Sequence, residues 1–555
     1  INAPMFEPVV ASHNPQPHEH IDHTAAALVG PFTAVMENAG DNDLAEPLIP
    51  PLEIGKGDAP TSDTPSSPDT EDAGVPMDDA SGTEGTSGAT GGGAVTTPLV
   101  AAVSAASIGQ FLLGYNTGVM NAPHAVVFPG HSTASWSIAV SAFAVGGGIG
   151  ALAGGPLADR RGRRGAVLSC SAAFLLGGAL QSFAPDMLTI VLGRLVIGVA
   201  SGGVSTVGPV YLGELAPESV RGALGTLFQL AVVLGILLSN VLAFPLATES
   251  RWRMLFLVTA ILAAVQLFCA PFLPESPRWL LSQDRESRKA RMVIKFLRGY
   301  RDDSEVEAEV ERSLRAVEAD NTTGGTGGGE GPRKTVRDLM TDRKIRPLVL
   351  GSLVLQMAQQ LSGINAVFYY STMFFDGVIG NPLVGTTLVS IVNVIATLLA
   401  VALMDKCGRR TLVLWSAGGM CICCILLILS LLGFLANIMA LVIVNLFVSF
   451  FELGLGPIPF LIVPEMFRTE YVSTAMSVSL LINWVCNFIV GLVFPFLDAY
   501  LGPFSFVPFG VILLLVFVFV LLRLPETRGK THDEIQREID GEVVGVGGFD
   551  AMPRM

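Results

Sequence analysis

The chain alternates long apolar runs with short polar stretches, and this alternation is its dominant pattern. A helix needs about 20 consecutive apolar residues to cross the roughly 30 Å hydrocarbon core of a bilayer. Such runs lie near residues 99–120, 134–157, 166–184, 188–213, 223–244 and 253–273, and again near 347–370, 384–404, 411–433, 437–463, 473–497 and 503–523. The pattern predicts an all-α membrane protein with 12 transmembrane helices.

Polar segments flank and interrupt these runs. Residues 1–95 are rich in Gly, Pro, Ser, Thr and acidic residues, which predicts a disordered tail, because such a segment buries too little apolar surface to fold. Residues 274–346 combine a charged, helix-permissive stretch with a Gly-rich break. The expected domains are an acidic tail at 1–95, a six-helix bundle at 98–273, a linker with short helices at 274–346, a second six-helix bundle at 347–523 and a C-terminal tail at 524–555.

Composition agrees with a protein that crosses the membrane many times. Half of the residues are hydrophobic, 15% are charged and the mean hydropathy is +0.56. The net charge of −14 has one source, since residues 1–95 hold 16 acidic residues and one lysine. The rest of the chain is nearly neutral, so charge predicts no nucleic-acid partner. The seven cysteines show no metal or disulfide spacing.

Basic residues predict the orientation. They cluster in alternate loops, at Arg160–Arg164, in the linker, at Lys406–Arg410 and at Arg523–Lys530. Because short cytoplasmic loops carry an excess of Lys and Arg, both termini and the linker are expected in the cytoplasm. The expected location is the plasma membrane, with the lipid bilayer as one partner and no obligate protein partner.

The two halves of the chain repeat one another. LADRRGRR (157–164) returns as LMDKCGRR (403–410), and PESPR (274–278) returns as PETRG (525–529). Glu214 corresponds to Glu465, and Asn116 corresponds to Asn365, at nearly the same offset. The repeat predicts two six-helix bundles in parallel orientation, with a substrate site near the midplane between them.

Charged residues of the repeated motifs predict ion pairs at the cytoplasmic ends of the helices. Arginine forms forked bonds to carboxylates, and Gly162 and Gly408 allow a tight turn beside each arginine pair. The candidates are Asp159, Arg163, Arg164, Glu214, Arg221, Glu275, Arg278, Asp405, Arg409, Arg410, Glu465 and Glu526. Their predicted role is to hold the cytoplasmic side shut. The alternative is that these charges only fix the topology.

Polar side chains inside the spans predict a binding pocket, because such groups must be paired or functional in a membrane. The candidates are Gln229, Gln359, Gln360, Asn365, Asn393, Glu452, Asn483 and Asn487, with Trp484 as a flat apolar wall. Amides donate and accept hydrogen bonds, as the hydroxyls of a neutral sugar do. Ser362 and Gly363 favour a break in the seventh span. Any single amide could instead join two helices.

These motifs together resemble the sugar porters of the major facilitator superfamily, and most of all the facilitative glucose transporters. The resemblance covers about 98–533 and rests on GPLADRRGRR, PESPRWLL, QQLSGINAVFYYS, DKCGRR, GPIPF, PEMF, NWVCNF and PETRGKT. It implies hexose contacts for Gln229, Gln359, Gln360, Asn365, Asn393, Glu452 and Trp484, and an outer gate at Tyr369 and Tyr370. It implies a neutral hexose as substrate and no cofactor.

Two positions depart from the family pattern. Phe460, which we include among the expected substrate contacts, stands where many relatives have Trp. Val472 stands where the family has an arginine, which the first half keeps as Arg221. Arg468 is the expected substitute for that arginine.

Asn116 predicts transport that is not coupled to protons. Proton-linked sugar porters resemble this chain but carry Asp at that position, and an amide does not titrate. The predicted function is uniport of a hexose by alternating access, with D-glucose and then D-fructose as the expected substrates. The alternatives are a proton–hexose symporter that uses Glu452 and a sugar sensor that does not transport. An enzyme is not expected, since no phosphate loop, metal cluster or nucleophile–base pair is present.

Overall fold

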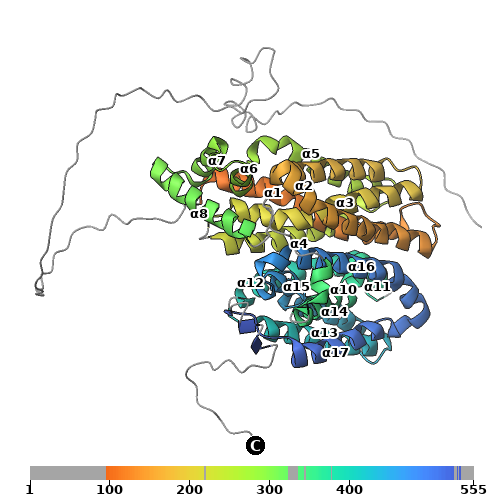
Figure 1. The fold of residues 1–555 in the computed structure, drawn as a ribbon. Helices are drawn as coiled ribbons and strands as arrows, with labels where there is room; N and C mark the ends of the chain where they lie inside the picture. Colours follow the sequence, from red (N-terminus) through yellow and green to blue (C-terminus); the bar gives the residue numbers. More distant parts are fainter. Residues whose placement is uncertain are drawn as a thin grey trace, which may run out of the picture. The chain divides into compact units, whose positions relative to one another are not determined.

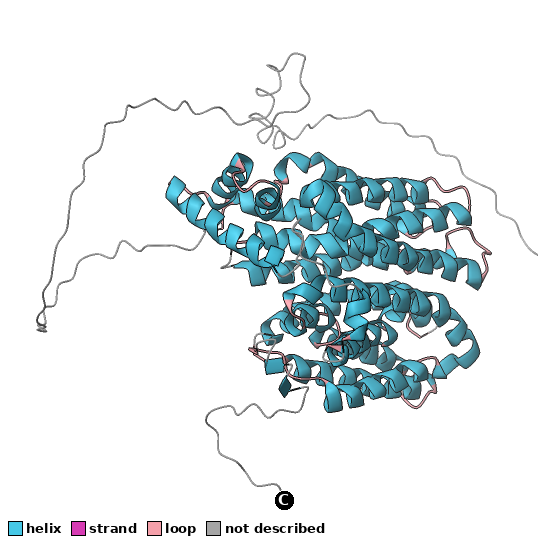
Figure 2. Ribbon diagram, in the orientation of Figure 1, coloured by secondary structure: helices cyan, strands magenta, loops and turns pink. Residues whose placement is uncertain are grey.

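The computed structural model describes residues 95–217, 220–322, 336–342, 345–376, 378–404, 406–530, 534–535 and 537–538, without the side chains of 221–226, 319–322, 469–470 and 473. The acidic tail, Asp405 and the side chain of Arg221 therefore lie outside the described residues. All described helices belong to one compact unit, Ser87–Met555. Figure 2 shows this part of the chain as helices joined by loops.

The N-terminal bundle contains the first six predicted spans in five elements. The second and third spans are two helices that meet at Gly162, whose φ of 80° and ψ of 167° are not helical, and together they make up one element. The bundle consists of α1 (Thr97–Gly118), α2 (Thr133–Ser182), α3 (Met187–Leu215), α4 (Arg221–Leu246) and α5 (Trp252–Phe268). Figure 1 shows these helices side by side in one half of the molecule.

The C-terminal bundle contains the other six spans, two of which are broken. Gly363 has a φ of 90° and separates the two helices of the seventh span, as the LSG sequence predicts. Residues 454–457 separate the two helices of the tenth span. The bundle consists of α10 (Arg346–Leu361), α11 (Ile364–Phe375), α12 (Pro382–Met404), α13 (Arg409–Leu431), α14 (Asn437–Leu453), α15 (Ile458–Met466), α16 (Thr469–Leu501) and α17 (Val507–Arg523).

The observed helices account for all 12 predicted spans. Eight stretches are long and apolar enough to cross a membrane, and α2 among them holds two spans. The 17-residue helices α5 and α17 add two, and the pair α10–α11 adds the last. The predicted all-α fold with 12 transmembrane helices in two bundles is confirmed.

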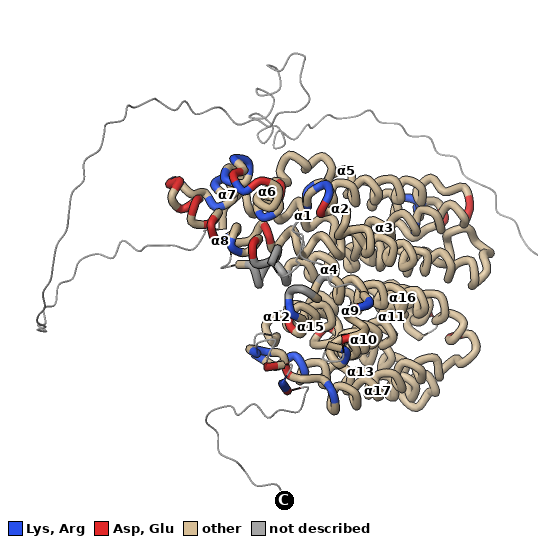
Figure 3. The backbone as a smooth tube through the Cα atoms, viewed as in Figure 1, with Lys and Arg blue, Asp and Glu red and all other residues tan. Residues whose placement is uncertain are grey.

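The described residues of the linker form α6 (Pro277–Gln283), α7 (Arg288–Arg298), α8 (Asp303–Thr322) and α9 (Val336–Thr341). Helices α6 and α7 contact the N-terminal bundle, and α8 packs against both of them. The Thr96 hydroxyl donates to the Leu297 carbonyl at 2.6 Å, and Arg298 Nη1 donates to the Leu215 carbonyl, at the end of α3, at 2.7 Å. Most charged residues of both bundles lie at the end of the helices that faces the linker (Figure 3).

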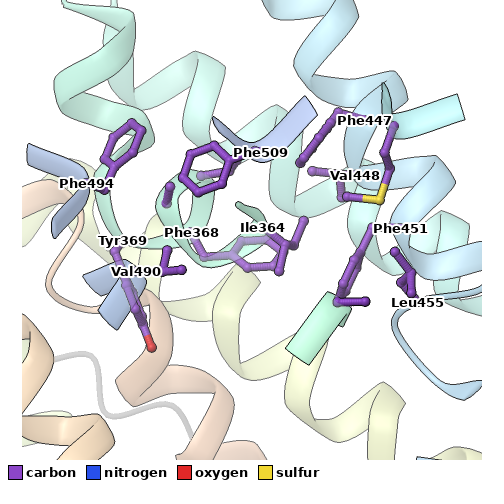
Figure 4. Close-up of a cluster of buried hydrophobic side chains, with 14 of the residues drawn as sticks. Ile364, Phe368, Tyr369, Phe447, Val448, Phe451, Leu455, Val490, Phe494 and Phe509 are labelled. Carbon is purple, nitrogen blue, oxygen red and sulfur yellow. The ribbon is translucent and has the colours of Figure 1, made fainter. Parts of the chain in front are cut away.

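The largest buried apolar cluster extends across both bundles. It includes Tyr115 and Met120 from the N-terminal bundle and surrounds the break between α10 and α11. Figure 4 shows the rings of Phe368, Phe494 and Phe509 gathered at this break. A Cβ added to Gly363 would lie 2.8 Å from the Phe509 ring, so close packing as well as backbone conformation requires glycine there.

Candidate functional site

Amide side chains from three helices form a connected network at the break in the seventh span. Asn483 Nδ2 donates to Gln359 Oε1 at 2.6 Å and to Gln356 Oε1 at 2.8 Å. Gln360 Nε2 donates to Asn483 Oδ1 at 3.0 Å, and Asn365 Nδ2 donates to Gln360 Oε1. The backbone joins this network, since Gln359 Nε2 donates to the Gly456 carbonyl at 2.6 Å. All five amides are buried, and each can exchange an internal bond for a bond to a hydroxyl group.

A second polar group lies between α4, α12 and α14. The carboxyl group of Glu452, which is 1% exposed, lies near Gln229 of the N-terminal bundle and near Thr397. Neither amide atom of Asn393 has a hydrogen-bond partner among the described residues, and the same is true of Glu452 Oε2. Buried polar groups without partners are rare in native proteins and indicate a place where a ligand or water binds.

Aromatic side chains form an apolar wall between the two bundles. Trp484 of α16 meets Phe143 of α2 edge to face, with 5.7 Å between ring centroids. Phe460 packs against the same cluster and is half-buried, so this departure from the family pattern lies at the wall. A Cβ added to Gly147 would lie 2.3 Å from the Trp484 ring, so α2 approaches the ring closely.

At the end of the molecule opposite the charged loops, hydrogen bonds join α11 to α16 within the C-terminal bundle, and one asparagine bonds across the two bundles. Tyr369 donates to Asn487 Oδ1 at 2.8 Å, and Tyr370 donates to the Gly491 carbonyl at 2.6 Å. Asn121, which follows α1, crosses to the other bundle, where its Nδ2 donates to Ser371 Oγ at 2.7 Å. Its Oδ1 accepts from the Thr372 backbone N–H at 2.9 Å.

Asn116 is paired within its own bundle. Its Nδ2 donates to the Leu112 carbonyl at 2.9 Å, and its Oδ1 accepts from the Thr259 hydroxyl at 3.2 Å. The Arg194 guanidinium is fully buried, donates to the Asn116 carbonyl at 2.8 Å and lies 4.4 Å above the Phe143 ring. Asn116 is therefore a neutral amide beside a buried cation.

The charged motif of the N-terminal bundle forms a compact cluster. Arg163 binds Glu214 with two bonds of 3.0 and 3.2 Å and also contacts Asp159 at 3.3 Å. Glu275 accepts from the backbone N–H groups of Arg163 at 2.7 Å and Arg164 at 3.1 Å. Burial raises the pKa of Glu275, and these N–H groups oppose the rise. The predicted partner Arg278 lies half-buried in α6.

The C-terminal bundle repeats this cluster with one change. Arg409 Nη2 contacts Glu465 at 3.1 Å, and Glu526 accepts from the backbone N–H groups of Arg409 at 2.7 Å and Arg410 at 3.2 Å. The Thr527 hydroxyl donates to the second oxygen of Glu465 at 2.6 Å. Thr527 thus supplies a contact to Glu465 in the half where Val472 replaces the arginine. Each of these ion pairs joins residues of one bundle.

Several residues of the site were missed by the sequence analysis. Gln356 lies one helical turn before Gln360, and that spacing is the signal that could have identified it. Asn240 donates to Ser390 Oγ across the bundles at 2.6 Å, and Asn121 makes the crossing described above. Only the three-dimensional structure brings these two asparagines to their partners. Among the described residues, no group of three His, Cys, Asp or Glu side chains is placed to bind a metal.

Comparisons with known proteins agree with this geometry. Residues 102–539 match the family model described as sugar (and other) transporter. The chain is 39% identical over 476 residues to solute carrier family 2, facilitated glucose transporter member 3 of Ovis aries, covering 81% of this chain and 94% of the relative. It is 40% identical over 472 residues to member 4 of Homo sapiens, covering 80% and 90%. Among solved structures, the chain is similar to the xylose transporter XylE from E. coli in a partially occluded inward-open conformation. The match has a TM-score of 0.67 and 24% identity, and it covers 79% of this chain and 100% of that chain. This similarity shows a shared fold.

Proposed function

Since the chain belongs to the sugar (and other) transporter family, we propose that it carries a hexose passively across the membrane. It is an integral membrane protein, and its family confirms the prediction of a transporter and not an enzyme. Relatives that cover most of the chain are facilitated glucose transporters, which supports D-glucose as substrate, with D-fructose as a second one.

One observation carries the proposal, namely the network of Gln356, Gln359, Gln360, Asn365 and Asn483 at the break of the seventh span. A hexose has hydroxyls that both donate and accept, so it can replace bonds within this network one for one. Asn393 and Glu452 offer further polar atoms toward the other bundle. Trp484 offers an apolar face for the C–H side of the sugar ring.

Transport then proceeds by alternating access. Asn121, Tyr369 and Tyr370 close the outer end when the bundles meet there. The ion pairs of Arg163 and Arg409 keep the charged end of each bundle ordered while the bundles move relative to one another. The basic loops place this end and both termini in the cytoplasm, and the plasma membrane is the proposed location.

Proton coupling requires a titratable group that changes its exposure during the cycle. Asn116 cannot titrate, which supports uniport. Glu452 supports the second candidate, a proton–hexose symporter, because its carboxyl group is buried between the bundles and its Oε2 has no partner among the described residues.

Counterflow of labelled hexoses in proteoliposomes, with and without an imposed pH gradient, tests the proposal. We expect exchange of D-glucose with no accumulation above equilibrium. Asn365→Ala should reduce this exchange at least tenfold, whereas Ser449→Ala is the control, since the Ser449 hydroxyl bonds within its own helix, to the Asn445 carbonyl. Accumulation driven by the pH gradient and abolished by Glu452→Gln would establish symport instead. Binding of D-glucose without flux would establish a sensor.

A further inference from the structure

The linker helix α7 has an outward face that the proposed transport function does not use. Its inward face is buried through Ala290, Ile294 and Leu297, which pack within the linker and against the N-terminal bundle. The opposite face follows from the helical period of 3.6 residues and carries Met292 and Phe296, flanked by Arg288 and Lys289. Phe296 is 61% exposed, which is unusual for a large ring on a charged helix.

Three other basic residues of α7 form ion pairs with acidic residues of α8. Arg291 contacts Glu307 at 2.6 Å, Lys295 contacts Asp303 at 2.6 Å, and Arg298 contacts Glu309 at 2.9 Å. Arg288 and Lys289 are exposed and have no acidic partner among the described residues. The charge of α7 that remains available therefore lies beside Phe296.

Two contacts place this face at the level of the membrane surface. The Leu297 carbonyl accepts from Thr96, the residue before the first span, and Arg298 donates to Leu215, the last residue of α3. Phe296 precedes both contact residues in the sequence. Its backbone therefore lies beside the ends of α1 and α3 that carry these contacts.

A second aromatic pair marks the same rim. Phe268 and Phe272 follow the end of the α5 span and are 83% and 52% exposed. The short helix at Ala270–Phe272 and α7 both pack against α1. In Figure 3 the basic residues of α7 lie at this charged end of the N-terminal bundle.

We propose that α7 is an interfacial helix that docks on anionic lipids of the adjacent leaflet, with Phe296 and Met292 inserted at the boundary between headgroups and acyl chains and with Arg288 and Lys289 on the headgroups. Aromatic and aliphatic residues flanked by basic ones bind membranes in this way, through apolar burial and attraction to negative lipids. The proposal requires that α1 and α3 cross the bilayer and is independent of which solute is carried.

Tryptophan fluorescence tests the insertion. The variant Phe296→Trp is placed in proteoliposomes with lipids brominated near the headgroup, and its fluorescence should be quenched more than that of the parent protein. The parent protein gives the quenching of the five native tryptophans. Ala308→Trp is the matched control, because Ala308 is exposed on α8 and is expected to remain unquenched. Both leaflets contain the same lipids, so the direction of insertion does not affect the result.

The charge requirement needs a second comparison. Quenching at position 296 should increase when phosphatidylserine replaces part of the phosphatidylcholine, and about 0.5 M salt should remove the increase. Arg288→Glu with Lys289→Glu should abolish it as well, while D-glucose counterflow in the same vesicles reports that the protein is folded. Three results would overturn the proposal. The first is an unquenched indole in the Phe296→Trp variant, and the second is equal quenching in neutral and anionic lipid. The third is an indole that is protected from an aqueous quencher only when a soluble protein is added.

Discussion

Asn121 gives the sharpest test of the closed outer end. This side chain is 2% exposed, and its two hydrogen bonds, to Ser371 Oγ and from the Thr372 N–H, join the two bundles. Asn121→Ala removes both bonds. At about 1 kcal/mol for each buried hydrogen bond, the closed outer end loses about 2 kcal/mol relative to the open one. The population with an open outer end should therefore rise about 30-fold.

Chemical modification can measure this population. Ser141 is 2% exposed and lies against Gly491 of the other bundle, so Ser141→Cys creates a thiol that is covered while the outer end is closed. The rate at which an external, impermeant thiol reagent modifies this cysteine should rise about 30-fold when Asn121→Ala is added. The Asn121→Ala protein without the new cysteine gives the background from the native thiols.

A graded variant strengthens the test. Ser371→Ala removes the acceptor of Asn121 Nδ2 and leaves the bond from the Thr372 N–H to Asn121 Oδ1, so about half of the effect, or about fivefold, is expected. If Asn121→Ala left the modification rate unchanged, the reasoning that these two bonds hold the outer end closed would be wrong.

Three further predictions concern the charged end and the outer loop. Thr527→Val should lower the thermal stability by about 1 kcal/mol, because the second oxygen of Glu465 loses its donor, whereas Thr527→Ser should retain the stability; equal melting of all three proteins would refute this role. Gly162→Ala and Gly408→Ala each place a Cβ 2.1 Å from a carboxylate oxygen, of Glu275 and Glu526, but only Gly162 also has a positive φ, of 80°, so Gly162→Ala should reduce folded yield more, and the reverse order would contradict this account. Burial, and secondarily His131, lower the pKa of His124 below its usual 6.5, so the folded state prefers the neutral ring and its stability is present above pH 6.5 and declines as pH falls below it; the melting temperature should fall less between pH 7.5 and 5.5 in His124→Gln than in the parent, and an equal fall would show that His124 does not contribute.

The number and type of the helices could be predicted because span length and repeat spacing are local properties of the sequence. The break at Gly363 was also predictable, since Ser362 and Gly363 interrupt an otherwise apolar run. The turn between the second and third spans was predictable too, because Gly162 of the LADRRGRR motif allows the tight backbone that separates the two helices of α2.

Long-range pairings were beyond the reach of the sequence. Asn121 and Ser371 are separated by 250 residues, and nothing in the local pattern of either indicates the other. The contact of Thr527 with Glu465 could not be predicted for a similar reason. The two residues are 62 positions apart in the sequence, whereas the expected substitute for the arginine at position 472, Arg468, is a neighbour of Glu465. The attachment of α7 to the N-terminal bundle includes hydrogen bonds with Thr96 and Leu215 that no periodicity predicts.

The close approach of Gly147 to Trp484 has a consequence for the evolution of this chain. A methyl group at position 147 would lie 2.3 Å from a rigid indole on the opposite bundle. Each of the two positions thus restricts which mutations the other accepts. A larger residue at position 147 is tolerated only after Trp484 has been replaced by a smaller residue. Divergent lineages that retain the indole should retain the glycine, and those that have lost it should be the ones in which position 147 is free to drift.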